Sequence, residues 1–149
     1  PAIAKGIGEQ LTKFPELYPY YTLLCDPGVS ASTAQVYKNL NFNLTPQEKY
    51  TIYAGFDKLI RGQEQGRKTD ISAVLHNDLE EPACRLYPEI NKTKKEMELL
   101  LHKKVHMTGS GSSLFVLYSD RKSAEQGYEC LLNKWDGSKK QIFLSSFRQ

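Results

Sequence analysis

The 149-residue chain has no long hydrophobic run and few cysteines, and each of these absences excludes a class of protein. Without an uninterrupted apolar stretch of about 20 residues, no membrane span is expected. The three cysteines, Cys25, Cys84 and Cys130, are odd in number, widely spaced and free of CxxC pairs. They therefore predict neither a disulfide framework nor a cysteine zinc site, and they favour a reducing compartment, which we expect to be the cytoplasm.

The chain also has little excess charge of either sign. Twenty Lys and Arg residues against seventeen Asp and Glu leave a net charge of +3, which is too small to predict a nucleic-acid partner. A chain of this length forms one ordinary domain, and it begins with Pro1 without the basic and apolar segments of a signal peptide. We therefore expect a piece of a longer protein that has a small or specific ligand and neither a nucleic-acid nor a membrane partner.

The first half of the chain predicts one strand followed by helices. A β-prone run over 20–25 ends at the turn sequence DPG, in which Asp26 is expected to cap the turn. A capping box at Ser32 begins a short helix, and a second box at Thr45 begins another. Asp78 is expected to cap a helix that runs to Leu86.

A longer helix is predicted from Pro88 onward. Its apolar positions lie on one face: Ile90, Met97, Leu100 and Leu101. Its lysines are expected to form the solvated face: Lys92, Lys94 and Lys95.

From Val105 the pattern changes to short β-like runs. Strands are predicted over 105–107, 114–118 and 141–147, and Asp120 caps a helix between the last two. The apolar positions of this helix have helical spacing: Ala124, Tyr128, Leu131, Leu132 and Trp135. The order of elements predicts an α+β fold, the ferredoxin-like split βαβ sandwich, in which helices cover one face of a four-stranded antiparallel sheet. The additional helices all fall in the first crossover.

The glycine-rich segment at 108–113 is the strongest candidate for chemistry, because backbone N–H groups free of Cβ crowding form concave nests for phosphate oxygens. No Lys-Ser or Lys-Thr pair follows, so the segment is not a P-loop. Leu114 stands where a dinucleotide fingerprint has its third glycine. Taken alone, the segment is also typical of a plain hairpin connection.

Other candidate residues allow two interpretations. Tyr37 follows the apolar Val36 on its short helix, which suits either an exposed ring that stacks on a base or a tyrosine at the edge of the core. His102 and His106 have the spacing of metal ligands on a helix, but HKKVH lacks the Glu of the zincin motif. The strand predicted at Val105 also separates them, so no metal site is expected.

Three segments together resemble the GHMP kinase superfamily: DPGVSASTAQVYKN at 26–39, HNDLEEPACRLYPEI at 76–90 and HMTGSGSSLFVLY at 106–118. In order and spacing they are similar to the C-terminal half of the kinases that act on 4-diphosphocytidyl-2-C-methyl-D-erythritol. AKGIGEQL at 4–11 is similar to the stretch that leads out of the N-terminal domain of those kinases. The resemblance implies that residues 1–18 lead out of a preceding domain and that 19–149 form a GHMP kinase C-terminal domain.

The resemblance also implies an activity, the ATP-dependent transfer of the γ-phosphoryl group to the erythritol hydroxyl in non-mevalonate isoprenoid biosynthesis. In such kinases the ATP loop and the catalytic Asp and Lys belong to the N-terminal domain. The complete enzyme is thus expected to use ATP with Mg²⁺, whereas this chain alone is expected to be inactive, with no catalytic or metal-binding side chain. Its expected partners are its own N-terminal kinase domain and a cytidylyl substrate.

Residue by residue, the resemblance assigns substrate binding to one segment and phosphate binding to another. Tyr37 matches the aromatic residue that stacks on the cytosine of the substrate, with Thr33 and Lys38 beside it. The glycine motif matches the family motif whose backbone amides approach the phosphates: Thr108, Gly109, Ser110, Gly111 and Ser112. Asn77 and Asp78 match an Asn-Asp-Leu-Glu motif, for which a structural role is expected.

Three alternatives remain open. The chain suits another GHMP small-molecule kinase, of the homoserine or mevalonate type, although Tyr37 favours a cytidylyl substrate. It also suits a non-catalytic ferredoxin-like binding module. An RNA reader of that fold carries a basic-Gly-aromatic-Gly element, which SSLFVLY at 112–118 lacks. The last alternative is a structural half that serves interdomain packing only.

Overall fold

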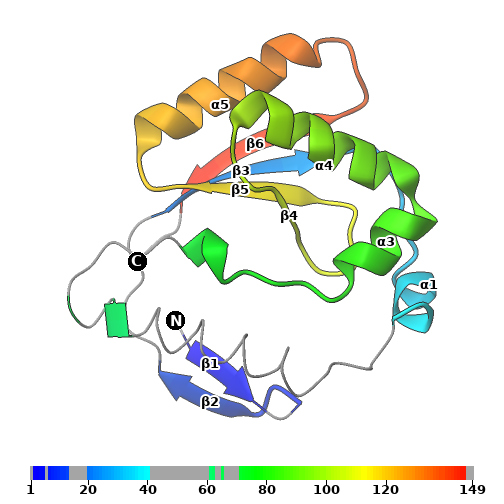
Figure 1. Cartoon of the computed structure of the whole chain (residues 1–149), viewed down its shortest axis with the longest axis vertical. Coiled ribbons are helices and arrows are strands. Elements are labelled where there is room, and N and C mark those ends of the chain that lie inside the picture. Colours follow the sequence, from blue (N-terminus) through cyan, green and yellow to red (C-terminus); the bar gives the residue numbers. More distant parts are fainter. Residues whose placement is uncertain are drawn as a thin grey trace.

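The computed structural model describes residues 2–5, 7–13, 20–40, 61–62, 65 and 71–146. The chain begins with a two-stranded antiparallel sheet, in which β1 (Ala2–Lys5) pairs with β2 (Gln10–Lys13) beside the main body of the fold (Figure 1). Local sequence patterns do not predict these strands. Their signal is weak because every side chain of β2 is exposed, so no alternation of apolar and polar residues marks a buried face.

The main sheet has four antiparallel strands in the order β4–β5–β3–β6. Their bounds are β3 (Tyr21–Asp26), β4 (His106–Met107), β5 (Leu114–Tyr118) and β6 (Gln141–Ser146). The central pairing sets Leu23 of β3 opposite Val116 of β5 and Leu144 of β6. This strand order is that of the split βαβ unit, and the predicted fold class is confirmed.

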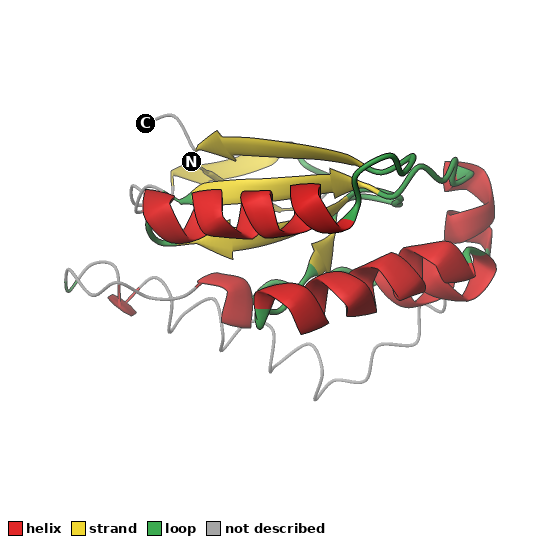
Figure 2. Ribbon diagram, turned by 90° about the horizontal axis from the view of Figure 1, so that it is seen from above, coloured by secondary structure: helices red, strands yellow, loops and turns green. Residues whose placement is uncertain are grey.

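The crossover between β3 and β4 carries the additional helices, as predicted. It contains α1 (Thr33–Lys38), the short 3₁₀ helix η1 (Ile71–Ala73), α3 (Glu80–Leu86) and α4 (Pro88–Leu101). The second connection contains α5 (Arg121–Lys134). Helices α4 and α5 lie on the same side of the sheet (Figure 2). The helix predicted from Thr45 lies outside the described residues.

The main core lies between the sheet and helices α4 and α5. Alternate side chains of β3 and β5 point into it and are buried: Leu23, Cys25, Leu114, Val116 and Tyr118. The helices contribute the buried residues Ile90, Met97, Ala124, Leu131 and, just beyond α5, Trp135. On the opposite face of the sheet, Leu117 packs with Tyr20 and Ile71 in a smaller cluster.

Several predicted caps are confirmed and one is wrong. Asp120 Oδ1 accepts a hydrogen bond from the Ser123 N–H at 2.8 Å, and Asp26 Oδ1 accepts one from the Gly28 N–H at 2.8 Å. Asp78 does not cap α3, because Leu79 occupies the N-cap position and makes no side-chain capping bond. The Asp78 carboxylate instead lies 2.6 Å from His76 Nε2.

Two predictions about helix faces were also wrong. Leu132 is 49% exposed, because the buried stripe of α5 follows Ala124 and Leu131 and leaves Leu132 at its edge. The Lys94 side chain is only 18% exposed, since it pairs with the carboxylate of Glu80 from α3 and with that of Glu98 one turn further along α4. No helix in the described part of the chain is long and apolar enough to cross a membrane.

Candidate functional site

Helix α1 presents Tyr37 at the surface. The Ser32 hydroxyl accepts a hydrogen bond from the Gln35 N–H at 3.4 Å and so begins the helix as its capping box predicts. Val36 is completely buried and anchors the helix to the core, whereas the next residue, Tyr37, is 51% exposed. Lys38 in the last turn is exposed as well. The exposed ring has the accessibility that stacking on a ligand requires.

The glycine-rich loop connects β4 to β5 as a tight turn. The Thr108 N–H donates to the Ser113 carbonyl at 3.0 Å, and the Gly111 N–H donates to the Thr108 carbonyl at 3.1 Å. Gly109 and Gly111 have positive φ angles of 58° and 88°, a region that favours glycine. A Cβ at Gly111 would lie 2.9 Å from Met107 Sδ, so a larger residue there would require the Met107 side chain to shift.

The loop retains backbone donors that its own folding does not use. Within the described part of the chain, no residue accepts a hydrogen bond from the N–H of Gly109, Ser110 or Ser112. Successive amides in a glycine-rich turn of this kind form a concave nest that suits an anion. The arrangement can therefore hold phosphate oxygens without any basic side chain in the loop itself.

The loop and helix α1, which are far apart in the sequence, meet through two hydroxyl groups. Thr33 Oγ1 and Ser110 Oγ lie 2.8 Å apart, and either can donate to the other. Tyr37 follows Thr33 by four residues, which places it one helical turn further along α1. The structure thus brings a residue of the predicted substrate-binding segment into direct contact with a residue of the predicted phosphate-binding loop.

Tyr87, at the end of α3, holds the beginning of α1. Its hydroxyl accepts a hydrogen bond from the Ser32 N–H at 2.9 Å and donates one to Gln35 Oε1 at 3.2 Å. No role of Tyr87 is expected from the sequence, although this residue lies in one of the three segments that carry the resemblance. Its contacts join residues 55 and 52 positions apart, so sequence spacing offered no signal for them.

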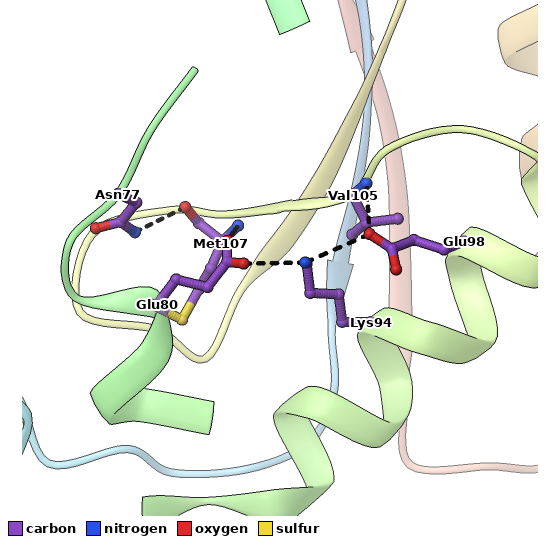
Figure 3. A network of polar contacts seen from close by, with 6 residues as sticks. All are labelled: Asn77, Glu80, Lys94, Glu98, Val105 and Met107. Carbon is purple, nitrogen blue, oxygen red and sulfur yellow. Dashed lines mark hydrogen bonds and ion pairs between the residues drawn. The ribbon is translucent and has the colours of Figure 1, made fainter. Parts of the chain in front are cut away.

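Asn77 holds the glycine-rich loop. Its Nδ2 donates to the carbonyls of Met107 and Gly109, both at 2.9 Å, while its Oδ1 accepts from the Leu79 N–H at 3.1 Å. Glu80 Oε2 accepts from the Met107 N–H at 3.1 Å. The contacts to Met107 satisfy backbone groups of β4, which is an edge strand of the described sheet, and Figure 3 shows the one between Asn77 and Met107.

A cluster of three charged side chains extends this support into α4. Lys94 Nζ lies 3.0 Å from Glu80 Oε1 and 3.3 Å from Glu98 Oε1, and Glu98 Oε1 accepts a hydrogen bond from the Val105 N–H at 3.3 Å (Figure 3). Partial burial acts to lower the pKa of Lys94, but the bonds and charges of the two carboxylates outweigh it and raise this pKa above 10.5. Lys94 therefore stays charged and keeps the cluster intact near neutral pH.

Two of the three cysteines have raised pKa values, and two of the three histidines lie on different elements. Burial raises the pKa of Cys25 to about 12 and also raises the pKa of Cys84, so both thiols stay protonated near neutral pH. His102 ends α4, whereas His106 is buried in β4. The described part of the chain contains no group of three side chains that could hold a metal ion.

This fold and loop match a known family. The family described as "GHMP kinases C terminal" matches residues 58–137, which is more than half of the chain. The chain belongs to the GHMP kinase C-terminal family. The glycine-rich loop at 108–112 and the helices α3 and α4 that support it lie within the matched residues.

Curated relatives support the assignment of the chain to this family. A 4-diphosphocytidyl-2-C-methyl-D-erythritol kinase of Lachnoclostridium phytofermentans is 34% identical over 149 residues, covering 98% of this chain and 48% of that protein. One of Pelobacter propionicus is 36% identical over 124 residues, covering 83% of this chain and 41% of that protein. The chain thus spans about half the length of the curated relatives it matches.

Solved structures show the same fold. A crystal structure of a 4-(cytidine 5'-diphospho)-2C-methyl-D-erythritol kinase superimposes with a TM-score of 0.66 at 25% identity, covering 99% of this chain and 50% of that one. A homoserine kinase from Cytophaga hutchinsonii superimposes with a TM-score of 0.73 at 16% identity, covering 99% of this chain and 47% of that one. The likeness to homoserine kinase concerns the fold alone.

Proposed function

We propose that this chain is the C-terminal portion of an ATP-dependent kinase that phosphorylates 4-diphosphocytidyl-2-C-methyl-D-erythritol. The single observation that carries the proposal is the contact between Thr33 and Ser110, which joins the helix of Tyr37 to the glycine-rich loop. The named relatives, at 32–36% identity, support this substrate over those of other GHMP kinases.

In this proposal Tyr37 stacks on the cytosine ring. The half-exposed ring needs no rearrangement of the core, because Val36 rather than Tyr37 anchors α1. Stacking of a base on an aromatic side chain contributes about 1–3 kcal/mol. Thr33 and the exposed Lys38 line the same segment, where Lys38 offers a positive charge to the diphosphate.

The loop from Thr108 to Ser112 binds phosphate oxygens in this proposal. The amides of Gly109 and Ser110 have no acceptor among the described residues, and they lie on the loop that contacts α1. Phosphoryl transfer depends mainly on positioning and on stabilisation of charge, so a domain that orients the diphosphate contributes to the reaction without supplying a base.

The reactive groups belong to the N-terminal kinase domain of the complete enzyme, which is the proposed partner of this chain. ATP with Mg²⁺ is the proposed phosphoryl donor, held by that domain, and residues 1–18 lead out of it. The 149-residue chain alone is then expected to show no kinase activity. We also propose a cytoplasmic location, for which the three free cysteines provide the support.

The proposal is tested by titrating the chain with cytidine diphosphate while backbone and aromatic NMR signals are followed. We expect the Tyr37 ring and the Ser110 amide to shift together with one dissociation constant. Tyr37→Ala should weaken binding about tenfold or more, whereas Tyr37→Phe, which keeps the ring face, should bind nearly as well as the wild type.

A parallel titration with homoserine distinguishes the proposed substrate from that of a homoserine kinase. Shifts of the 108–112 amides with homoserine, and none with cytidine diphosphate, would favour a homoserine kinase. An intact fold that responds to neither compound would favour the role in interdomain packing only.

A further inference from the structure

The two parts of the site are held from the two ends of one segment, residues 77–87, which contains helix α3. Asn77 at the beginning of this segment binds the loop, and Tyr87 at its end binds helix α1. Between them, Glu80 connects the same segment to Lys94 of α4. Helix α3 is therefore a common support for two elements that the chain places far apart.

Asn77 determines which way the loop amides point. In a trans peptide the carbonyl of one residue and the N–H of the next point in opposite directions. Because Asn77 Nδ2 binds the Gly109 carbonyl, the Ser110 N–H is directed away from the Asn77 side chain. The Met107 carbonyl is held by the same amide group, so the loop is fixed at two points that span Thr108.

Tyr87 determines where the first turn of α1 lies. Its hydroxyl bridges the Ser32 N–H and the Gln35 side chain, which come from the cap and the first turn of the helix. Helix α1 has six residues and buries only Val36, so it has few apolar contacts to hold it in place. The Tyr87 bridge supplies the orientation that burial alone does not.

We propose that Asn77 and Tyr87 are positioning residues, Asn77 for the phosphate-binding loop and Tyr87 for the helix that carries Tyr37. This inference rests on the proposed function, because it takes the loop and α1 to be the two ligand-binding elements. Neither residue touches the ligand. Each acts through the element it holds, and the two roles are separable.

The experiment measures two dissociation constants for each variant of the 149-residue chain, one for cytidine and one for inorganic pyrophosphate. Asn77→Ala removes both donated bonds without adding charge, whereas Asn77→Asp keeps the acceptor for the Leu79 N–H. These two variants share only the loss of the donors. Tyr87→Phe removes the bridging hydroxyl and keeps the ring. Tyr128→Phe on α5 is the matched control.

We expect a crossed pattern. Both Asn77 variants should weaken pyrophosphate binding about tenfold, equivalent to one lost hydrogen bond of about 1.4 kcal/mol, and leave cytidine binding within about twofold. Tyr87→Phe should weaken cytidine binding about tenfold and leave pyrophosphate binding within about twofold. In the free protein, the Asn77 variants should shift the Ser110 amide signal, and Tyr87→Phe should shift the Tyr37 ring signal.

Three other outcomes would each overturn the positioning roles of Asn77 and Tyr87 for a different reason. Equal loss of both ligands in every variant, with a lowered melting temperature, would show a general structural role. Loss of pyrophosphate binding in Asn77→Asp but not in Asn77→Ala would assign the effect to the new charge. A wild type that binds neither compound would overturn the proposed function and the positioning roles with it.

Discussion

Replacing Gly111 by Ala tests whether the shape of the glycine-rich loop is set by sterics at that position. The new Cβ would lie 2.9 Å from Met107 Sδ and 3.5 Å from Ile90 Cδ1, and both of these side chains are buried. Gly111 also has a φ of 88°, which costs an L-residue about 1–2 kcal/mol. Together with about 1–3 kcal/mol for overpacking, the free energy of unfolding should fall by roughly 2–5 kcal/mol.

Gly109→Ala is the matched control, because its φ of 58° carries the same backbone penalty while nothing lies within 4 Å of the new Cβ. It should cost only about 1–2 kcal/mol. Urea unfolding of both variants measures the difference, and a pyrophosphate titration shows whether Gly111→Ala also loses the ligand. Equal destabilisation by the two substitutions would refute the steric argument.

Three further predictions concern the packing and titration of the domain. A Cβ at Gly127 would meet Tyr118 Oη and lie 3.0 Å from its Cζ, so Gly127→Ala should destabilise by about 1–3 kcal/mol in thermal unfolding, and adding Tyr118→Phe should recover part of this. A gain in stability in Gly127→Ala, as helix propensity alone predicts, would contradict this expectation. Burial raises the pKa of Tyr118 and of Cys25 to about 12, from 10.0 and 9.0. The unfolded chain releases these protons at a lower pH than the folded protein does, so the free energy of unfolding should fall from about pH 9 upward. In Cys25→Ala this fall should be less steep. Equal pH slopes in the variant and the wild type would argue against a contribution of the buried thiol. A double-mutant cycle of Thr33→Val and Ser110→Ala should give a coupling of about 0.5–1.5 kcal/mol in unfolding free energy, and strict additivity would rule out the bond.

Local patterns were sufficient for most of the main sheet and its helices. The run LFVLY predicted β5 with its observed bounds, and Asp120 caps α5 as expected, because both signals depend only on residues close in the sequence. The prediction that Asp78 caps α3 was wrong because neighbouring residues make the competing contacts. His76 pairs with the Asp78 carboxylate, and Asn77 rather than Asp78 accepts a hydrogen bond from the Leu79 N–H.

The sequence predicted the two segments of the candidate site, but not the contacts that hold them in place. The roles of Tyr37 and of the loop remain predictions, while the structure shows that Thr33 and Ser110 meet. Lys94 was expected to be solvated because helical spacing alone could not show that Glu80 of another helix faces it.

The amino-acid sequence by itself determined most of the main sheet and its helices, the fold class and the residues that carry the family resemblance, because periodicity, capping and turn chemistry act over a few residues. Only the tertiary structure decided which elements support the site. Asn77 reaches the loop and Tyr87 reaches α1 across 30 to 55 residues of chain, and such contacts depend on how the helices pack rather than on any local pattern.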